Sequence, residues 1–84
     1  MKIQVTQQHI NSGLKGSCTS DPIALALKDA GFSEPWVSAY YIQTDKGDKS
    51  TRVETPDSVD YFQRLFDNGS PVHPFEFELE EHAS

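Results

Sequence analysis

The spacing of apolar residues divides the chain into predicted strands and helices. Residues 75–80 alternate strictly, with two phenylalanines and a leucine on one face of a strand and three glutamates on the other. Residues 2–6 alternate in the same way. Residues 35–44 are rich in aromatic and β-branched side chains and predict one long strand, and residues 50–54 predict another.

A short helix is predicted over residues 20–31, and it carries its own start and stop signals. Ser20 or Asp21 can cap its N-terminus, Pro22 suits the first helical position, and Gly31 suits the residue after the last turn. Its apolar residues leave little polar surface, so we expect it to be buried at the centre of the fold. These residues are Ile23, Ala24, Leu25, Ala26, Leu27 and Ala30.

A second helix is predicted to start at the Thr55-Pro56-Asp57 segment and to end at Asn68-Gly69. Its apolar residues fall on one side, which predicts that only this side is buried. Near the N-terminus, Thr6 can cap a single short turn that Gly13 closes.

The order strand, helix, strand, strand, helix, strand indicates an α+β fold. The simplest packing is a four-stranded, mostly antiparallel sheet with two helices on one face. A chain of 84 residues predicts one domain over residues 1–84. One cysteine excludes an internal disulfide. No apolar run spans a membrane, and residues 1–6 lack the apolar block of a signal peptide, so we expect a cytoplasmic protein.

The formal net charge of −6 is concentrated in the second part of the chain. Residues 54–84 contain eight acidic residues and one arginine, whereas residues 1–53 are close to neutral. This balance argues against direct binding to nucleic acid, which requires a basic surface. It is compatible with a basic protein partner.

Three glutamates on the predicted last strand, Glu76, Glu78 and Glu80, form a row with a spacing of about 6.7 Å. Asp57 and Asp60 can extend this acidic surface. One interpretation is that the charges protect a sheet edge from aggregation. The other is that they dock onto a lysine- and arginine-rich groove of a partner, including one that normally holds nucleic acid.

The aromatic residues Trp36, Tyr40 and Tyr41 are a second candidate binding surface. Aromatic side chains on a sheet can stack on bases, but no lysine or arginine lies beside them in the sequence to contact phosphates. A place in the core or in a protein interface is therefore favoured.

Candidate chemistry is limited to Cys18 and His9. Cys18 precedes a predicted helix N-terminus, where a thiolate is stabilised, and His9 or His73 could approach it in the fold. The cysteine and the histidines, His82 included, do not show the spacing of known metal-ligand motifs. We therefore expect a protein without catalytic residues, metal or cofactor. A small enzyme or metal-dependent module around Cys18 and His9 is the alternative.

Three stretches together resemble a family of small uncharacterised proteins from phages, prophages and their bacterial hosts. They are Thr-Gln-x-His-Ile at residues 6–10, Cys-x-x-x-Pro-Ile-Ala-Leu-Ala-Leu at residues 18–27, and Phe-Asp-x-Gly-x-Pro-Val-x-Pro-Phe-x-Phe-Glu-Leu at residues 66–79. This chain has Asp21 where some members carry a second cysteine, which argues against a cysteine-pair site.

The resemblance implies a viral or mobile-element origin and assigns no activity. By analogy with other small acidic phage proteins, we expect an anti-CRISPR-type inhibitor that occupies a basic surface of a host defence or nucleic-acid-handling complex. The contact residues would be Glu76, Glu78, Glu80, Asp57 and Asp60 with Trp36, Tyr40 and Tyr41. A phage structural or assembly component, which would be a homo-oligomer, is a further alternative.

Overall fold

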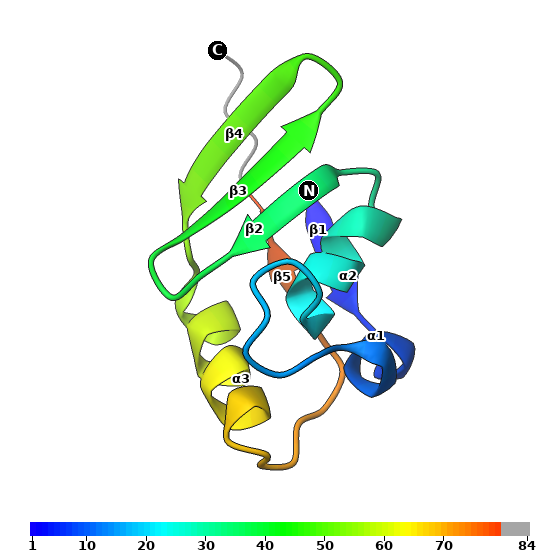
Figure 1. The fold of residues 1–84 in the computed structure, drawn as a ribbon, viewed down its shortest axis with the longest axis vertical. Helices are drawn as coiled ribbons and strands as arrows, with labels where there is room; N and C mark the ends of the chain where they lie inside the picture. The colour runs from blue at the N-terminus through cyan, green and yellow to red at the C-terminus, as the bar shows by residue number, and fades with distance from the viewer. Residues whose placement is uncertain (80–84) are drawn as a thin grey trace.

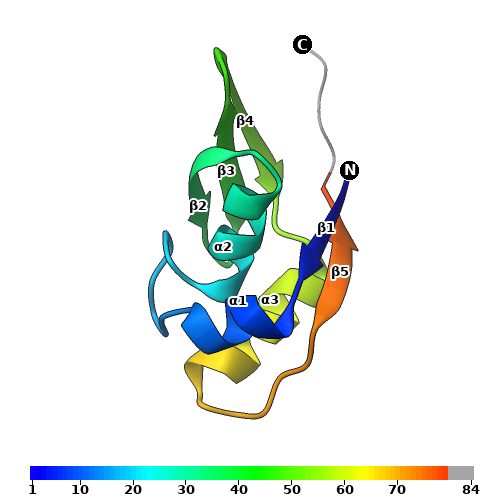
Figure 2. The same ribbon diagram turned by 90° about the vertical axis from the view of Figure 1, so that its right-hand side faces the viewer.

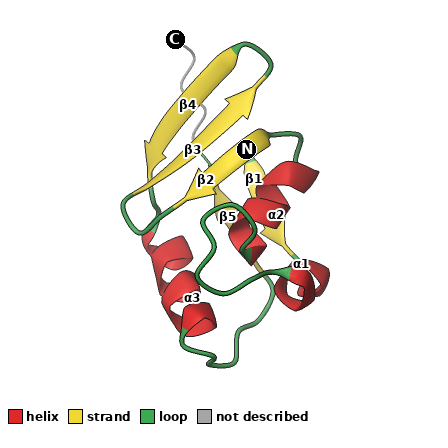
Figure 3. Ribbon diagram, viewed as in Figure 1, coloured by secondary structure: helices red, strands yellow, loops and turns green. Residues whose placement is uncertain are grey.

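The computed structural model describes residues 1–79, in which three helices and five strands are present (Figures 1 and 3). The strands form two antiparallel sheets, one with the order β1-β5 and one with the order β2-β3-β4. In chain order the elements are β1 (Lys2–Val5), α1 (Gln7–Ser12), α2 (Pro22–Asp29), β2 (Ser33–Val37), β3 (Tyr41–Lys46), β4 (Lys49–Glu54), α3 (Asp57–Asp67) and β5 (Phe75–Glu78).

Helix α2 lies between the two sheets. Figure 2 shows the β2-β3-β4 sheet on one side of α2 and the β1-β5 pair on the other. The helix contacts β1, β2 and α1, and most of its apolar residues are buried, whereas Leu25 and Ala30 are half-buried. The expectation of a buried central helix is therefore confirmed. One cluster of buried apolar side chains joins residues from α2, α3 and both sheets.

The α+β class is confirmed, but the predicted single four-stranded sheet is wrong. The chain forms five strands in two sheets, and the helices lie between and beside them instead of covering one face. The β1 strand, which was expected to join the common sheet, pairs only with β5, with Ile3 opposite Phe77. Since α2 is apolar nearly all round, it needs cover on two sides, and one sheet cannot provide this.

The extra strand arises because the predicted strand over residues 35–44 is interrupted at Ser38. Its hydroxyl accepts hydrogen bonds from the N–H groups of Tyr40 and Tyr41 and donates one to the Tyr41 carbonyl, at 3.3, 3.1 and 3.0 Å. These bonds stabilise a turn, so that the chain reverses and Val37 pairs with Ile42. Because residues with high β-propensity lie on both sides of the turn, the sequence pattern predicts one continuous strand here.

Both ends of α2 follow their sequence signals. The Asp21 carboxylate accepts a hydrogen bond of 2.7 Å from the Ala24 N–H. At the other end, the N–H of Phe32 donates to the Leu27 carbonyl and that of Gly31 to the Lys28 carbonyl, with Gly31 at φ +100°. This pattern is a Schellman motif, and it turns the chain from α2 into β2.

Helix α3 starts at the predicted segment but lacks a side-chain cap at its N-terminus. The N-cap position is held by Pro56 and has no side-chain hydrogen bond. The hydroxyl of Thr55 instead donates to the Ser38 carbonyl at 2.7 Å, which ties the start of α3 to the β2-β3 turn. The apolar side of α3 is buried as expected, with Phe62 packed against Phe75 at 4.8 Å between ring centroids.

The β3-β4 hairpin is tighter than expected. Lys46 pairs with Lys49, so the loop contains two residues, of which Gly47 has φ +64°. A glycine with positive φ at the first loop position is typical of a type II′ turn, whose twist matches that of the strands. The hairpin thereby fixes the register between β3 and β4. In the described part of the chain, no helix has the length and apolar character needed to cross a membrane.

Candidate functional site

The two described glutamates of the predicted acidic row have cationic partners within the chain. On β5, the Glu76 carboxylate lies 3.8 Å from the Lys2 ammonium group, and the Glu78 carboxylate lies 2.8 Å from the α-amino group of Met1. The hydrogen bond and the positive charge of this α-amino group hold the pKa of Glu78 below its ordinary value. Glu80 lies outside the described residues. The paired carboxylates offer a basic partner less attraction than free ones.

Asp57 and Asp60 lie on a separate element, in the N-terminal part of α3. There both favour the positive end of the helix dipole. The Asp60 carboxylate also lies 3.2 Å from the guanidinium group of Arg64, one helical turn later. Their positions therefore have a structural explanation that requires no partner.

The solvent side of the three-stranded sheet gathers the aromatic candidates with polar and charged groups. We call this surface the outer face. Trp36 is 45% exposed and Tyr41 is half-buried on it, whereas Tyr40, 82% exposed, projects from the adjoining β2-β3 turn. The inner side of the same strands carries the buried Val37, Ile42 and Thr44. The outer face comprises Glu34, Trp36, Tyr41, Gln43, Asp45 and Arg52.

Strand pairing places an arginine beside the aromatic side chains. Trp36 pairs with Gln43 across β2 and β3, and Gln43 pairs with Arg52 across β3 and β4. The Arg52 guanidinium donates to the Gln43 side-chain oxygen at 3.2 Å and lies 4.4 Å from the centre of the Tyr41 ring. The sequence showed no cation near residues 36–41, because Arg52 follows in a different strand and reaches them only through the register of the hairpin.

A β-bulge shapes one end of the outer face. Ser33 pairs with Asp45 and Trp36 with Gln43, so two residues of β2, Glu34 and Pro35, stand opposite one residue of β3. Proline lacks an N–H donor, and it is tolerated here because β2 is an edge strand with a bulge. Glu34 has φ +48°, the only positive φ among the described non-glycine residues.

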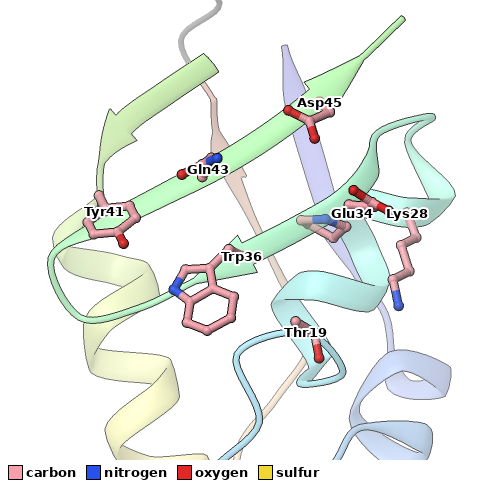
Figure 4. Close-up of a pocket in the computed structure, with 8 residues that line it drawn as sticks. Thr19, Lys28, Glu34, Trp36, Tyr41, Gln43 and Asp45 are labelled. Carbon is pink, nitrogen blue, oxygen red and sulfur yellow. The ribbon is translucent and has the colours of Figure 1, made fainter. Parts of the chain in front are cut away.

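The bulge borders a cleft of about 640 Å³ (Figure 4). Glu34, Trp36, Tyr41 and Asp45 line it from the sheet, and Thr19 and Lys28 line it from the loop before α2 and from α2 itself. An exposed indole and two carboxylates thus share one depression. This arrangement suits recognition by contact, since it combines an aromatic anchor with charged groups at the rim.

The alternative centre around Cys18 and His9 is not assembled as a catalytic pair in the described residues. The His9 Nδ1 accepts a hydrogen bond of 2.9 Å from the Thr6 N–H, so the ring proton sits on Nε2 and is donated to the Asp29 carboxylate at 2.5 Å. His9 is therefore engaged as the third residue of a capping box with Thr6.

Cys18 lies elsewhere, in a smaller pocket of about 260 Å³ against α3. In that pocket Asp21 is buried and accepts a second hydrogen bond, of 2.6 Å, from the Gln63 amide. Burial raises the pKa of the Asp21 carboxyl, and the hydrogen bonds from Ala24 and Gln63 partly offset this effect. Within residues 1–79, no group of three or more His, Cys, Asp or Glu side chains is arranged to hold a metal ion.

Comparisons with protein-family models, with curated proteins and with solved structures give no match. The contact surface is therefore inferred from the chemistry of the outer face. Two of its residues, Trp36 and Tyr41, were candidates from the sequence. Arg52 and Glu34 were missed, because their positions depend on strand register and on the bulge.

Proposed function

We propose that the protein is a binding module that contacts another protein through the outer face. The supporting observation is the juxtaposition of Trp36, Tyr41 and Arg52 on one exposed sheet surface, with Tyr40 projecting beside it. Tryptophan, tyrosine and arginine are the residue types most enriched among the residues that dominate protein–protein binding energy. The rigid sheet holds these side chains in place, which lowers the entropic cost of binding.

The charge of the protein favours a protein partner over a nucleic acid. Although Arg52 and Lys28 lie on or beside the outer face, Glu34 and Asp45 line the same cleft. The net charge is −6, and a nucleic acid would be repelled unless a basic patch outweighed it. A partner with a basic surface is attracted by the same charge.

For the class of partner we propose a basic protein or complex of the host that handles nucleic acid, which the module inhibits by occupying its surface. The net charge and the resemblance of the sequence to small phage and prophage proteins support this proposal. With Glu76 and Glu78 paired inside the chain, the outer face takes the place of β5 as the proposed contact surface. The proposed activity is binding without catalysis.

Site-specific photo-crosslinking tests the contact surface. A benzophenone amino acid at position 40, beside the outer face, is expected to cross-link a partner in a bacterial host extract. The same amino acid at Tyr61, which is 67% exposed on α3, is the matched control and is expected to give no such product. Adding Trp36→Ala to the position-40 variant should reduce the yield at least about tenfold, since a hot-spot tryptophan contributes about 2 kcal/mol or more.

Two outcomes would contradict the proposal. The first is cross-linking at position 61 equal to that at position 40, and the second is an unchanged yield after Trp36→Ala. Circular dichroism of each variant establishes that the fold is retained, which is expected because Trp36 is largely outside the core.

A further inference from the structure

We propose that the cleft of the outer face takes an arginine side chain of the partner, which the Trp36 ring and the carboxylates of Glu34 and Asp45 attract. This inference rests on the proposed function and specifies the chemistry of the partner at one position. It concerns the cleft of about 640 Å³ that Figure 4 shows.

The first argument concerns the aromatic rings. In the described part of the chain, two rings carry an internal cation: Lys46 lies 5.3 Å from the centre of the Phe32 ring and Arg52 lies 4.4 Å from that of Tyr41. Residues 1–79 place no cation over Trp36. The indole binds cations more strongly than the other aromatic rings, and here it is 45% exposed. The open ring is thus the best cation-binding surface of the outer face.

The second argument concerns the carboxylates. Glu34 and Asp45 line the same cleft as Trp36, and neither takes part in an ion pair with any described residue. Asp45 accepts a hydrogen bond from the Ser50 hydroxyl, which fixes one of its oxygens. A cleft that holds an open aromatic ring and two carboxylates without ion pairs is complementary to an arginine side chain, because a guanidinium group stacks on aromatic rings and donates hydrogen bonds to carboxylates.

The third argument concerns the backbone at Glu34. A φ of +48° is unfavourable for a glutamate, and the following Pro35 restricts this residue further. The bulge places Glu34 in the cleft beside the buried Pro35, which also lines it. Strained residues of this kind concentrate at binding sites, where the strain is part of the function.

The charge of Lys28 distinguishes a cationic ligand of the cleft from an anionic one. It lies in the last turn of α2 and lines the cleft, and in Figure 4 its side chain extends away from the sheet. If the cleft binds a cation, the Lys28 charge opposes binding. If it binds a phosphate or a carboxylate, the same charge assists binding. Removing the charge therefore changes the affinity in opposite directions for the two classes of ligand.

Trp36 is the only tryptophan, so its fluorescence and its indole N–H resonance report directly on the cleft. The full chain is titrated with the capped peptide Gly-Arg-Gly and with Gly-citrulline-Gly, which has the same shape and no charge. We expect a saturable, salt-sensitive change with the arginine peptide only. Glu34→Gln should weaken binding about three- to tenfold and Lys28→Ala should strengthen it about two- to threefold, because each removes one partly exposed charge.

The arginine assignment is overturned if the citrulline peptide gives the same change, if Lys28→Ala weakens binding, or if a thymidine oligonucleotide perturbs Trp36 and the arginine peptide does not. The failure of the proposed function is recognised separately. If Trp36→Ala abolishes cross-linking from position 40 but Glu34→Gln and Asp45→Asn do not, the outer face binds a partner and only the arginine assignment is wrong.

Discussion

The two sheets present charged side chains to solvent in different ways. On the β1-β5 pair, the cations of Met1 and Lys2 lie next to the carboxylates of Glu78 and Glu76. On the β2-β3-β4 sheet, Arg52 stacks on Tyr41, whereas Trp36 and Glu34 have no cationic partner among the described residues. The carboxylates of the first surface are neutralised by cations of the same chain. On the second surface, the Trp36 ring and the Glu34 carboxylate are free to bind a cation of a partner.

This difference shows why the charge of a sequence segment does not locate a binding surface. The alternation in residues 75–78 correctly indicates which side chains face solvent. It does not indicate what stands opposite them, because antiparallel pairing brings residues from the other end of the chain, and here Lys2 lies opposite Glu78. Binding capacity depends on the charges left after such pairs have formed.

The largest expected effect comes from α2, on which both sheets depend. Leu27→Ala should lower the free energy of unfolding by about 3–4 kcal/mol, because it leaves a cavity between the two sheets. Urea unfolding followed by Trp36 fluorescence and by far-ultraviolet circular dichroism measures this loss. Coincident curves are expected, since the sheets should unfold together.

The matched control is Leu14→Ala. Because Leu14 is 60% exposed, this substitution should change the free energy of unfolding little. A loss below about 1 kcal/mol for Leu27→Ala, or separate transitions for the two probes, would contradict the central role of α2.

Helix α2 was also the element that could be predicted best. The Asp21 cap, Pro22 and Gly31 act within one or two turns of the helix, so their effects are written locally in the sequence. The division into two sheets could not be predicted in the same way. It depends on the turn at Ser38, whose hydroxyl competes with strong β-formers on both sides.

The candidate site was predicted in part. Trp36, Tyr40 and Tyr41 stood out as aromatic residues in a predicted strand, but whether they were exposed depended on the turn that separates β2 from β3. The contact of Arg52 with Tyr41 needs the two-residue hairpin, and the place of Glu34 needs the bulge. Both are properties of strand register, which local spacing does not specify.

Asp21 offers the next largest effect, because it caps the helix between the sheets while its carboxylate is buried. Asp21→Ala removes the cap and should lower the free energy of unfolding by about 1–2 kcal/mol. Asp21→Asn retains a capping oxygen and cannot ionise. The pKa of Asp21 is raised in the folded state, which means that folding favours the protonated carboxyl. The stability that this carboxyl contributes is therefore fully present below the ordinary pKa of 3.8, and it is lost as pH rises through the folded pKa.

The stability of wild type relative to Asp21→Asn should therefore fall as pH rises above about 4. Urea unfolding of both proteins at each pH measures the difference, in which the other titrating groups cancel. A difference that stays constant, or grows in favour of wild type, would show that burial of the charge carries no cost.

Glu34 tests whether strain is stored on the open sheet. Glu34→Gly should raise the free energy of unfolding by about 1 kcal/mol, since relief of strain worth about 1–3 kcal/mol exceeds the larger chain entropy of glycine. Glu34→Ala keeps a Cβ atom and should show no such gain. Chemical denaturation compares the three proteins, and equal stabilities would mean that this backbone conformation is not strained.

The smallest expected effect contrasts the two sheets at equal change of charge. Glu76→Gln with Glu78→Gln removes two carboxylates from β5, and Glu34→Gln with Asp45→Asn removes two from the outer face, so both variants have the same net charge. Because Glu76 and Glu78 are already paired with internal cations, the first variant should leave cross-linking from position 40 nearly unchanged. The second should reduce it clearly, since neither Glu34 nor Asp45 takes part in an ion pair with a described residue. Equal losses in the two variants would mean that overall charge, not the arrangement of the outer face, attracts the partner. A larger loss in the first would return the contact surface to β5, with the partner displacing Lys2 and the Met1 amino group from the carboxylates.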